Sequence, residues 1–178
     1  MTTMREVFYG VISQEMAPYF FMKEKICSFF GHRDVIITDR LYEITTSEII
    51  KAMELGFYTF YFGGYGIFDD LCHKIVTKIK NDHPELNIKR IYCVPQERYL
   101  YKNTRYFKRE NYEEVIYLEP SFNSWYKSIY FRNCAMIDHS DLIIFYTEAR
   151  EDSGAYTAYK YAIKKRKKTI NLYDINLS

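Results

Sequence analysis

The chain contains few of the residues that would assign it to a specialised class. Its 178 residues include only 7 Gly, 4 Pro and one Trp, which argues against a low-complexity chain. No apolar run is long enough to cross a bilayer, and the first 21 residues lack the basic start and unbroken apolar stretch of a signal peptide. We therefore expect a globular, cytoplasmic protein that has no membrane partner.

Cysteine is also sparse, and its spacing predicts no metal site. Cys27, Cys72, Cys93 and Cys134 form no Cys-x-x-Cys pair and lie in apolar segments, where free cysteine behaves as a small hydrophobe. The four histidines lack ligand spacing as well. This pattern predicts a reducing compartment, no zinc and no cofactor.

Net charge gives little reason to expect a polyanionic partner. The formal charge is +2, too small to make nucleic acid an obligatory partner. One segment, residues 98–109, interleaves aromatics with cations. It could stack bases of single-stranded nucleic acid, cover a nucleotide as a lid, or be a plain surface loop. Nucleic-acid binding therefore stays open but is not favoured, and the oligomeric state is also open, with a homo-oligomer among the alternatives.

Strand and helix patterns alternate along the chain. Strands are expected at residues 25–30, 57–62, 88–94, 115–118, 141–147 and 169–173, and helices at 39–55, 67–81, 122–140 and 153–167. Such alternation predicts parallel strands joined by right-handed crossovers. We expect an α/β fold, a Rossmann-like three-layer sandwich with a mostly parallel sheet. Residues 22–178 form one domain, and residues 1–21 are an N-terminal extension to which we assign no structure or function.

Two glycine-bearing turns, each between an apolar strand and a helix, carry the functional prediction. The first runs through Gly63, Gly64, Tyr65 and Gly66 to Asp69. The second follows the strand at 142–146 and begins its helix at Ser153, Gly154 and Thr157. Glycine permits close approach of a ligand to the backbone, and a helix N-terminus offers free N–H groups and partial positive charge. Two such turns indicate an anion, above all the phosphate of a nucleotide.

Each of these residues also has a purely structural interpretation. The first turn could be a tight turn in which Asp69 only complements the helix dipole, and Ser153 could simply be an N-cap. In the functional interpretation, glycine and serine backbone groups bind the phosphate and Asp69 holds a sugar hydroxyl.

Two further segments supply candidate side chains. Gly31, His32 and Arg33 directly follow the first strand, so they belong at the mouth of the crevice. Arg132 and Asn133 lie in a helix, where the arginine could form a forked pair with phosphate or a salt bridge on a solvated face. We expect Arg33 and Arg132 to pair with phosphate.

The motifs resemble those of the SLOG superfamily, which includes YpsA-like proteins, the DNA-processing protein DprA and the LOG-type phosphoribohydrolases. The segment Phe29–Arg33 is similar to its "FxGHR" opening, and Gly63–Asp69 resembles its "GGA.GID" turn. Phe131–Asn133 with Ser140–Ile144 looks like the "RN…SD.vi" segment, and Ser153–Ala158 looks like the "SG…TA" helix start. The likeness covers residues 24–173 and implies a Rossmann-like fold that binds nucleotides or nucleotide-derived ligands.

The LOG-type members release a base from a nucleoside monophosphate, and the comparison with them fails at one place. Their "PGGxGTxxE" helix start falls on the second turn, with Thr157 as the threonine, but Tyr159 and Lys160 stand where the glutamate would be. We therefore expect a protein that senses or sequesters a small nucleotide-derived ligand. Glycosidic cleavage that uses Glu148, Glu151 or Asp152 is the enzymatic alternative.

Overall fold

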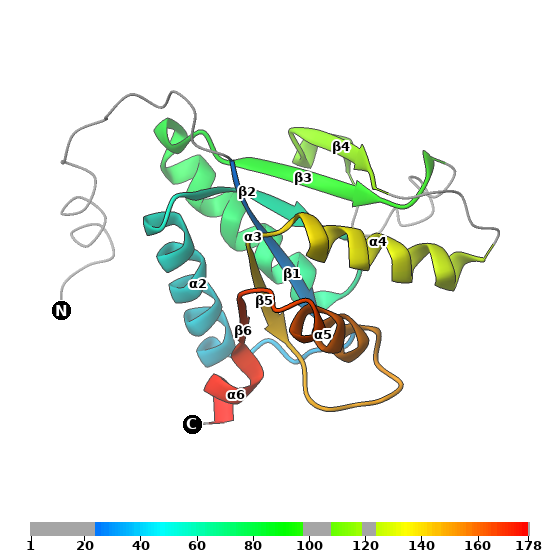
Figure 1. The fold of residues 1–178 in the computed structure, drawn as a ribbon. Coiled ribbons are helices and arrows are strands. Elements are labelled where there is room, and N and C mark those ends of the chain that lie inside the picture. Colours follow the sequence, from blue (N-terminus) through cyan, green and yellow to red (C-terminus); the bar gives the residue numbers. More distant parts are fainter. Residues whose placement is uncertain (1–23, 98–107, 119–123, 178) are drawn as a thin grey trace.

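The computed structural model describes residues 24–97, 108–118 and 124–177. The N-terminal extension at 1–21 and most of the basic-aromatic segment at 98–109 lie outside these ranges. One six-stranded sheet forms the centre of the fold (Figure 1). Its strands are β1 (Lys25–Gly31), β2 (Phe57–Phe62), β3 (Lys89–Val94), β4 (Glu114–Tyr117), β5 (Leu142–Tyr146) and β6 (Thr169–Asn171).

Helices follow most of these strands. They are α2 (Asp39–Glu54), α3 (Ile67–Asp82), α4 (Trp125–His139), α5 (Gly154–Lys164) and α6 (Leu172–Leu177), with short 3₁₀ turns at Pro84–Leu86 and Arg109–Asn111. The N-cap of α2 is Thr38, whose hydroxyl accepts from the Leu41 N–H at 3.1 Å. The helix is followed by Gly56, whose φ of 85° is the left-handed conformation that commonly ends helices at a glycine.

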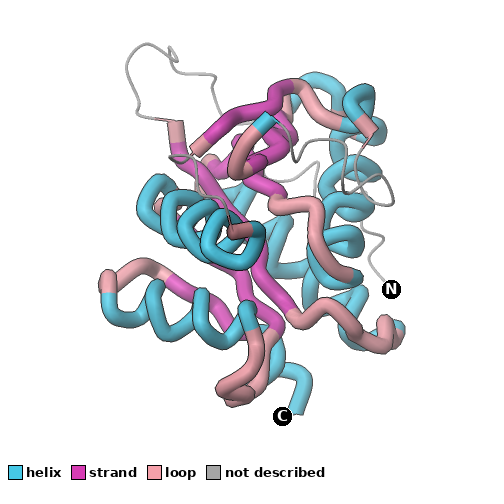
Figure 2. Tube along the Cα trace, turned by 90° about the vertical axis from the view of Figure 1, so that its right-hand side faces the viewer, coloured by secondary structure: helices cyan, strands magenta, loops and turns pink. Residues whose placement is uncertain are grey.

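The strand order is β4-β3-β2-β1-β5-β6, and every pairing is parallel. Helices α2 and α3 lie on one face, and α4 and α5 pack together on the other (Figure 2). The predicted α/β three-layer sandwich is therefore confirmed. No helix in the described ranges combines the length and the apolar character needed to span a bilayer.

The core is divided into two by the sheet. In β5, Leu142 and Ile144 pack toward α2 and α3, whereas Ile143 and Phe145 pack toward α4 and α5. Both faces of the strand are buried, which explains its unbroken apolar sequence. On the first face, the Phe29 ring stacks on Phe62 with centroids 5.3 Å apart.

Two predicted boundaries near the C-terminus are wrong. Helix α5 ends at Lys164 rather than 167, because the chain turns through Arg166 with φ of 55°. The last strand ends at Asn171, whose side chain bonds both backbone groups of Thr147 and also accepts from the Tyr173 N–H. The Asn171 side chain thus takes up the backbone groups of Thr147 and also bonds the start of the next helix. The pairing of β6 with β5 ends there, so residues 172–177 form a helix instead of more strand.

Candidate functional site

The candidate site lies at the carboxyl edge of the sheet, where β1 and β5 are neighbours. The chain leaves β1 toward the face covered by α2 and leaves β5 toward the face covered by α5 (Figure 1). Parallel neighbours whose crossovers go to opposite faces leave a crevice beyond their ends, and open α/β sheets bind ligands there. Gly31 ends β1, Gly63 follows β2, and residues 147–153 follow β5.

The first glycine turn is closed by hydrogen bonds within the protein. The Asp69 carboxylate accepts from the N–H of Gly63 at 3.2 Å and from that of Gly64 at 2.8 Å. Gly64 has φ of 62°, and a Cβ there would lie 2.2 Å from the Tyr92 ring. Backbone conformation and packing therefore both require this glycine. Because these two N–H groups already have an acceptor, the turn does not offer them to a phosphate in this conformation.

The start of α3 is closed by the loop that follows β1. Gly66 has φ of 111°, and a Cβ there would lie 3.1 Å from the Cα of Arg33. The Arg33 carbonyl accepts from the Ile67 N–H at 2.9 Å. Gly31 packs just as closely, since a Cβ there would lie 2.5 Å from the Phe68 side chain. These glycines therefore permit the loop after β1 to pack closely against the start of α3.

Asp69 is a buried carboxylate with an altered acidity. Its side chain is 6% exposed, and burial raises its pKa to about 6. The Arg132 guanidinium and the Gly63 and Gly64 N–H groups act in the opposite direction, because they favour the charged form. Asp69 is therefore mostly ionised at pH 7 and serves as the anchor of the first turn.

Arg132 is buried and bonded to backbone. Its Nη1 donates to the Gly63 carbonyl at 2.7 Å and to the Cys93 carbonyl at 3.0 Å, and its Nε donates to the Asn133 side chain at 3.0 Å. With 3% exposure, this arginine joins α4 to the ends of β2 and β3. The expected pairing of Arg132 with phosphate stays a prediction, and these contacts give the side chain a structural role.

Arg33, the other candidate cation, lies on the surface. Its guanidinium stacks on the Tyr65 ring, with Cζ 4.3 Å from the ring centroid, and Tyr65 contacts Trp125 edge-on at 6.4 Å. Within the described part of the chain, no carboxylate forms an ion pair with Arg33. Among the described residues, the guanidinium is therefore held by the Tyr65 ring and its charge is not paired with a carboxylate. Trp125 was not among the predicted site residues, because nothing local to its sequence shows that α4 begins beside the first turn.

The His32 side chain contacts the second turn and the loop that leads into it. The ring is 8% exposed, with Nδ1 3.0 Å from the Ser153 hydroxyl and Nε2 accepting from the Glu148 N–H at 3.1 Å. The Thr147 hydroxyl lies 3.4 Å from the same Nε2. Burial lowers the pKa of His32, and Arg150 acts in the same direction, while Glu148 and Asp152 oppose it. The histidine is neutral at pH 7 and fills the space between β1 and the β5–α5 loop.

The second glycine turn is open on one side. Ser153 caps α5 by accepting from the Tyr156 N–H at 3.3 Å, and its carbonyl accepts from the Thr157 N–H at 2.9 Å. A Cβ added to Gly154 would meet no atom of the described residues within 4 Å. Among the described residues, no acceptor is bonded to the N–H of Gly154 or Ala155. The start of α5 thus keeps two N–H donors beside unfilled space.

The carboxylates of the β5–α5 loop all have partners. Glu148 accepts from the Tyr173 hydroxyl at 2.9 Å, and Glu151 pairs with Lys160 at 2.5 Å. Arg150 lies 3.6 Å from Asp152 and 3.9 Å from Glu148. Each of these carboxylates is therefore engaged by a tyrosine, lysine or arginine side chain of the protein itself.

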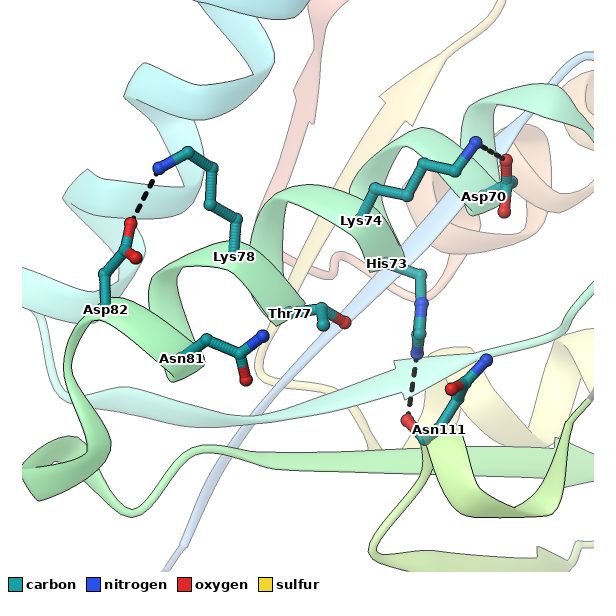
Figure 3. A pocket seen from close by; sticks show the side chains of 8 residues that line it. All are labelled: Asp70, His73, Lys74, Thr77, Lys78, Asn81, Asp82 and Asn111. Carbon is teal, nitrogen blue, oxygen red and sulfur yellow. Dashed lines mark hydrogen bonds and ion pairs between the residues drawn. The ribbon is translucent and has the colours of Figure 1, made fainter.

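A hollow of about 510 Å³ lies elsewhere, on the outer side of α3 (Figure 3). His73 borders it and bonds the Asn111 carbonyl through Nε2 at 3.1 Å. Its charged residues form two ion pairs, Lys74 with Asp70 and Lys78 with Asp82. Because these charges cancel, the hollow offers no net attraction to a phosphate. Its lining consists of Asp70, His73, Lys74, Thr77, Lys78, Asn81, Asp82 and Asn111.

Comparison of the chain with models of known protein families gives no match, and comparison with curated proteins gives none either. In the described ranges, no three His, Cys, Asp or Glu side chains gather closely enough to hold a metal ion. The interpretation of the site therefore depends on its own geometry. That geometry brings Gly31, His32 and Arg33 between the two turns, and it separates a closed first turn from a partly open second one.

Proposed function

We propose that the protein binds a small nucleotide-derived ligand through a phosphate group at the start of α5. The observation that carries the proposal is the open face of Gly154, where a Cβ would meet no atom of the described residues within 4 Å. Uncommitted N–H groups at a helix N-terminus attract an anion. The place supports the proposal as well, because it is the crevice beside the carboxyl ends of β1 and β5.

The energy available at one helix end limits how tightly phosphate alone can bind. Micromolar affinity corresponds to about 8 kcal/mol, whereas a helix terminus contributes up to about 2 kcal/mol and each charge-assisted hydrogen bond about 1.5–3 kcal/mol. The rest must come from the nucleoside. Tyr156, half-buried in the first turn of α5, offers a ring for that contact.

The resemblance to the SLOG superfamily supports the same proposal but would assign ligand contacts to both turns. The geometry favours the second, since the first turn has its Gly63 and Gly64 N–H groups bonded to Asp69. We therefore place the phosphate at the second turn. Sensing or sequestering a ligand requires no catalytic group, which agrees with the paired state of Glu148, Glu151 and Asp152.

The test is titration of the protein with nucleoside monophosphates and the matching nucleosides, followed by calorimetry. We expect at least one nucleotide to bind and its nucleoside to bind far more weakly. Mass spectrometry of small molecules released from the purified protein selects which nucleotides to test.

The variant Gly154→Asp places a negative charge in front of the free N–H groups. A carboxylate in the first turn suits the helix dipole, so stability is kept or raised by about 0.3–1 kcal/mol, while repulsion abolishes nucleotide binding. Gly154→Asn is the matched control, because it adds the same volume without the charge. Equal affinity of wild type and Gly154→Asp for every nucleotide would exclude this site.

A further inference from the structure

His32 occupies the junction between β1 and the β5–α5 loop, and each of its ring nitrogens has a defined partner. Nε2 lies 3.1 Å from the backbone nitrogen of Glu148, and Nδ1 lies 3.0 Å from the oxygen of Ser153. The two partners belong to the same loop, and that loop leads directly into α5. The ring of the residue that directly follows β1 therefore positions the loop that follows the neighbouring strand β5.

The hydrogen-bond partners determine the tautomer of His32. A backbone N–H can only donate, so Nε2 must accept from Glu148 and carries no hydrogen. In the neutral ring the hydrogen is then on Nδ1, which donates to the Ser153 oxygen. This direction excludes His32 as a general base for Ser153 through that bond, because the ring already gives its proton toward the hydroxyl.

The state of Ser153 follows from the same bonds. Its oxygen accepts from His32 Nδ1 and from the Tyr156 N–H at 3.3 Å, which uses both lone pairs. Within the described part of the chain, no acceptor receives the Ser153 hydroxyl hydrogen. The hydroxyl can therefore act only as a donor, next to the N–H groups of Gly154 and Ala155.

We infer that His32 is a positioning residue that holds the β5–α5 loop and keeps the Ser153 hydroxyl a donor, so that anion binding at the start of α5 requires the neutral ring. This inference rests on the function proposed above and adds a pH dependence to it. His32 does not contact the anion. It acts through Ser153 and Glu148.

Protonation of the ring would break this arrangement. An added hydrogen on Nε2 would face the Glu148 N–H, so two donors would meet at 3.1 Å. The charged groups that face the ring are Arg150, Glu148 and Asp152, all from the β5–α5 loop. Acid therefore releases the loop from β1 and weakens the site.

The direction in which anion affinity changes with pH distinguishes a positioning role of His32 from direct contact between His32 and the anion. A histidine that touched the anion would bind it more tightly when charged, so affinity would rise in acid. A positioning histidine has the opposite effect, and affinity falls by up to about tenfold for each pH unit below the His32 pKa.

Inorganic sulfate is the suitable probe, because its charge does not change between pH 5 and 8. Sulfate binding is followed through the backbone amide signals of Gly154 and Ala155, and the His32 ring is titrated by NMR in the same samples. We expect sulfate affinity to decrease in acid with the midpoint of the His32 titration.

Two variants assign the effect. The His32→Gln side chain has one amide that can accept from Glu148 and donate to Ser153, and this amide does not titrate. We expect the variant to bind sulfate more weakly than wild type at pH 7, with an affinity that does not change with pH. His73→Gln alters another buried histidine, on α3, and should retain the wild-type pH profile. Each variant is first shown by circular dichroism to be folded across the pH range.

The possible failures are distinguishable. If wild type binds neither sulfate nor any nucleotide at any pH, the proposed function is wrong. If sulfate binds and its affinity rises in acid or stays constant, the positioning role of His32 is wrong. A decrease that persists in His32→Gln would also overturn it, because that side chain does not titrate.

Discussion

The guanidinium of Arg132 is bonded to the carbonyl oxygen of Gly63, with Nη1 and the oxygen 2.7 Å apart. The same glycine gives its N–H to Asp69, so a cation from α4 and an anion from α3 hold it from both sides. This arrangement holds the first glycine turn in place, and the charged side chains of Arg132 and Asp69 are both bonded to backbone groups.

Arg132→Gln is expected to destabilise the fold. The substitution removes donors from the Gly63 and Cys93 carbonyls and leaves Asp69 buried without its neighbouring cation, and such losses cost about 3–5 kcal/mol. Denaturant unfolding measures the effect. Arg33→Gln is the matched control, because that arginine is exposed and stacked on Tyr65, and its loss should cost less than about 1 kcal/mol. Equal costs for the two variants would contradict the structural role of Arg132.

The two glycine turns should respond in opposite ways to alanine. Gly64→Ala forces a side chain into a left-handed conformation and against the Tyr92 ring, so we expect a loss of more than about 1–2 kcal/mol. Gly154→Ala adds a methyl group to open space at a helix start. Alanine favours the helical conformation over glycine by up to about 1 kcal/mol, so we expect this variant to be as stable as wild type or more stable. Thermal unfolding of both variants is the measurement. A stable Gly64→Ala protein would mean that the first turn is not held as described.

Asp69 should make stability depend on pH between its unfolded and folded pKa values. Burial raises the folded pKa to about 6 from 3.8, so between these values the folded protein holds a proton that the unfolded chain has released. This contribution to stability is complete below pH 3.8 and is lost as the pH rises through 6.

The measurement is the free energy of unfolding of wild type and Asp69→Asn from pH 4 to 7. The wild-type value minus the variant value should decrease as the pH rises. An increase over that range would show that the carboxylate is stabilised in its charged form instead, with a pKa below the ordinary value.

Much of the fold could be predicted because the signals are local. The alternation of strands and helices is determined by the spacing of apolar residues among near neighbours in the sequence. The prediction failed at Asn171, where helix α6 begins instead of further strand, because the Asn171 side chain bonds Thr147, the residue after the neighbouring strand β5. The hydrogen bonds that join His32 to Ser153 and Arg132 to Gly63 are of the same long-range kind. His32 and Ser153 are 121 residues apart, and Arg132 and Gly63 are 69 apart.

By itself, the sequence determined the three-layer architecture, the parallel direction of the strands and the edge of the sheet at which both glycine turns lie. It could do so because hydrophobic periodicity and turn residues act within a few residues. Only the tertiary structure decided which turn is closed. Asp69 and Arg132 could equally have faced a ligand, and their engagement with the first turn depends on how α3 and α4 pack on the sheet. The open face of Gly154 is likewise a property of packing, since no side chain from elsewhere in the described ranges fills it.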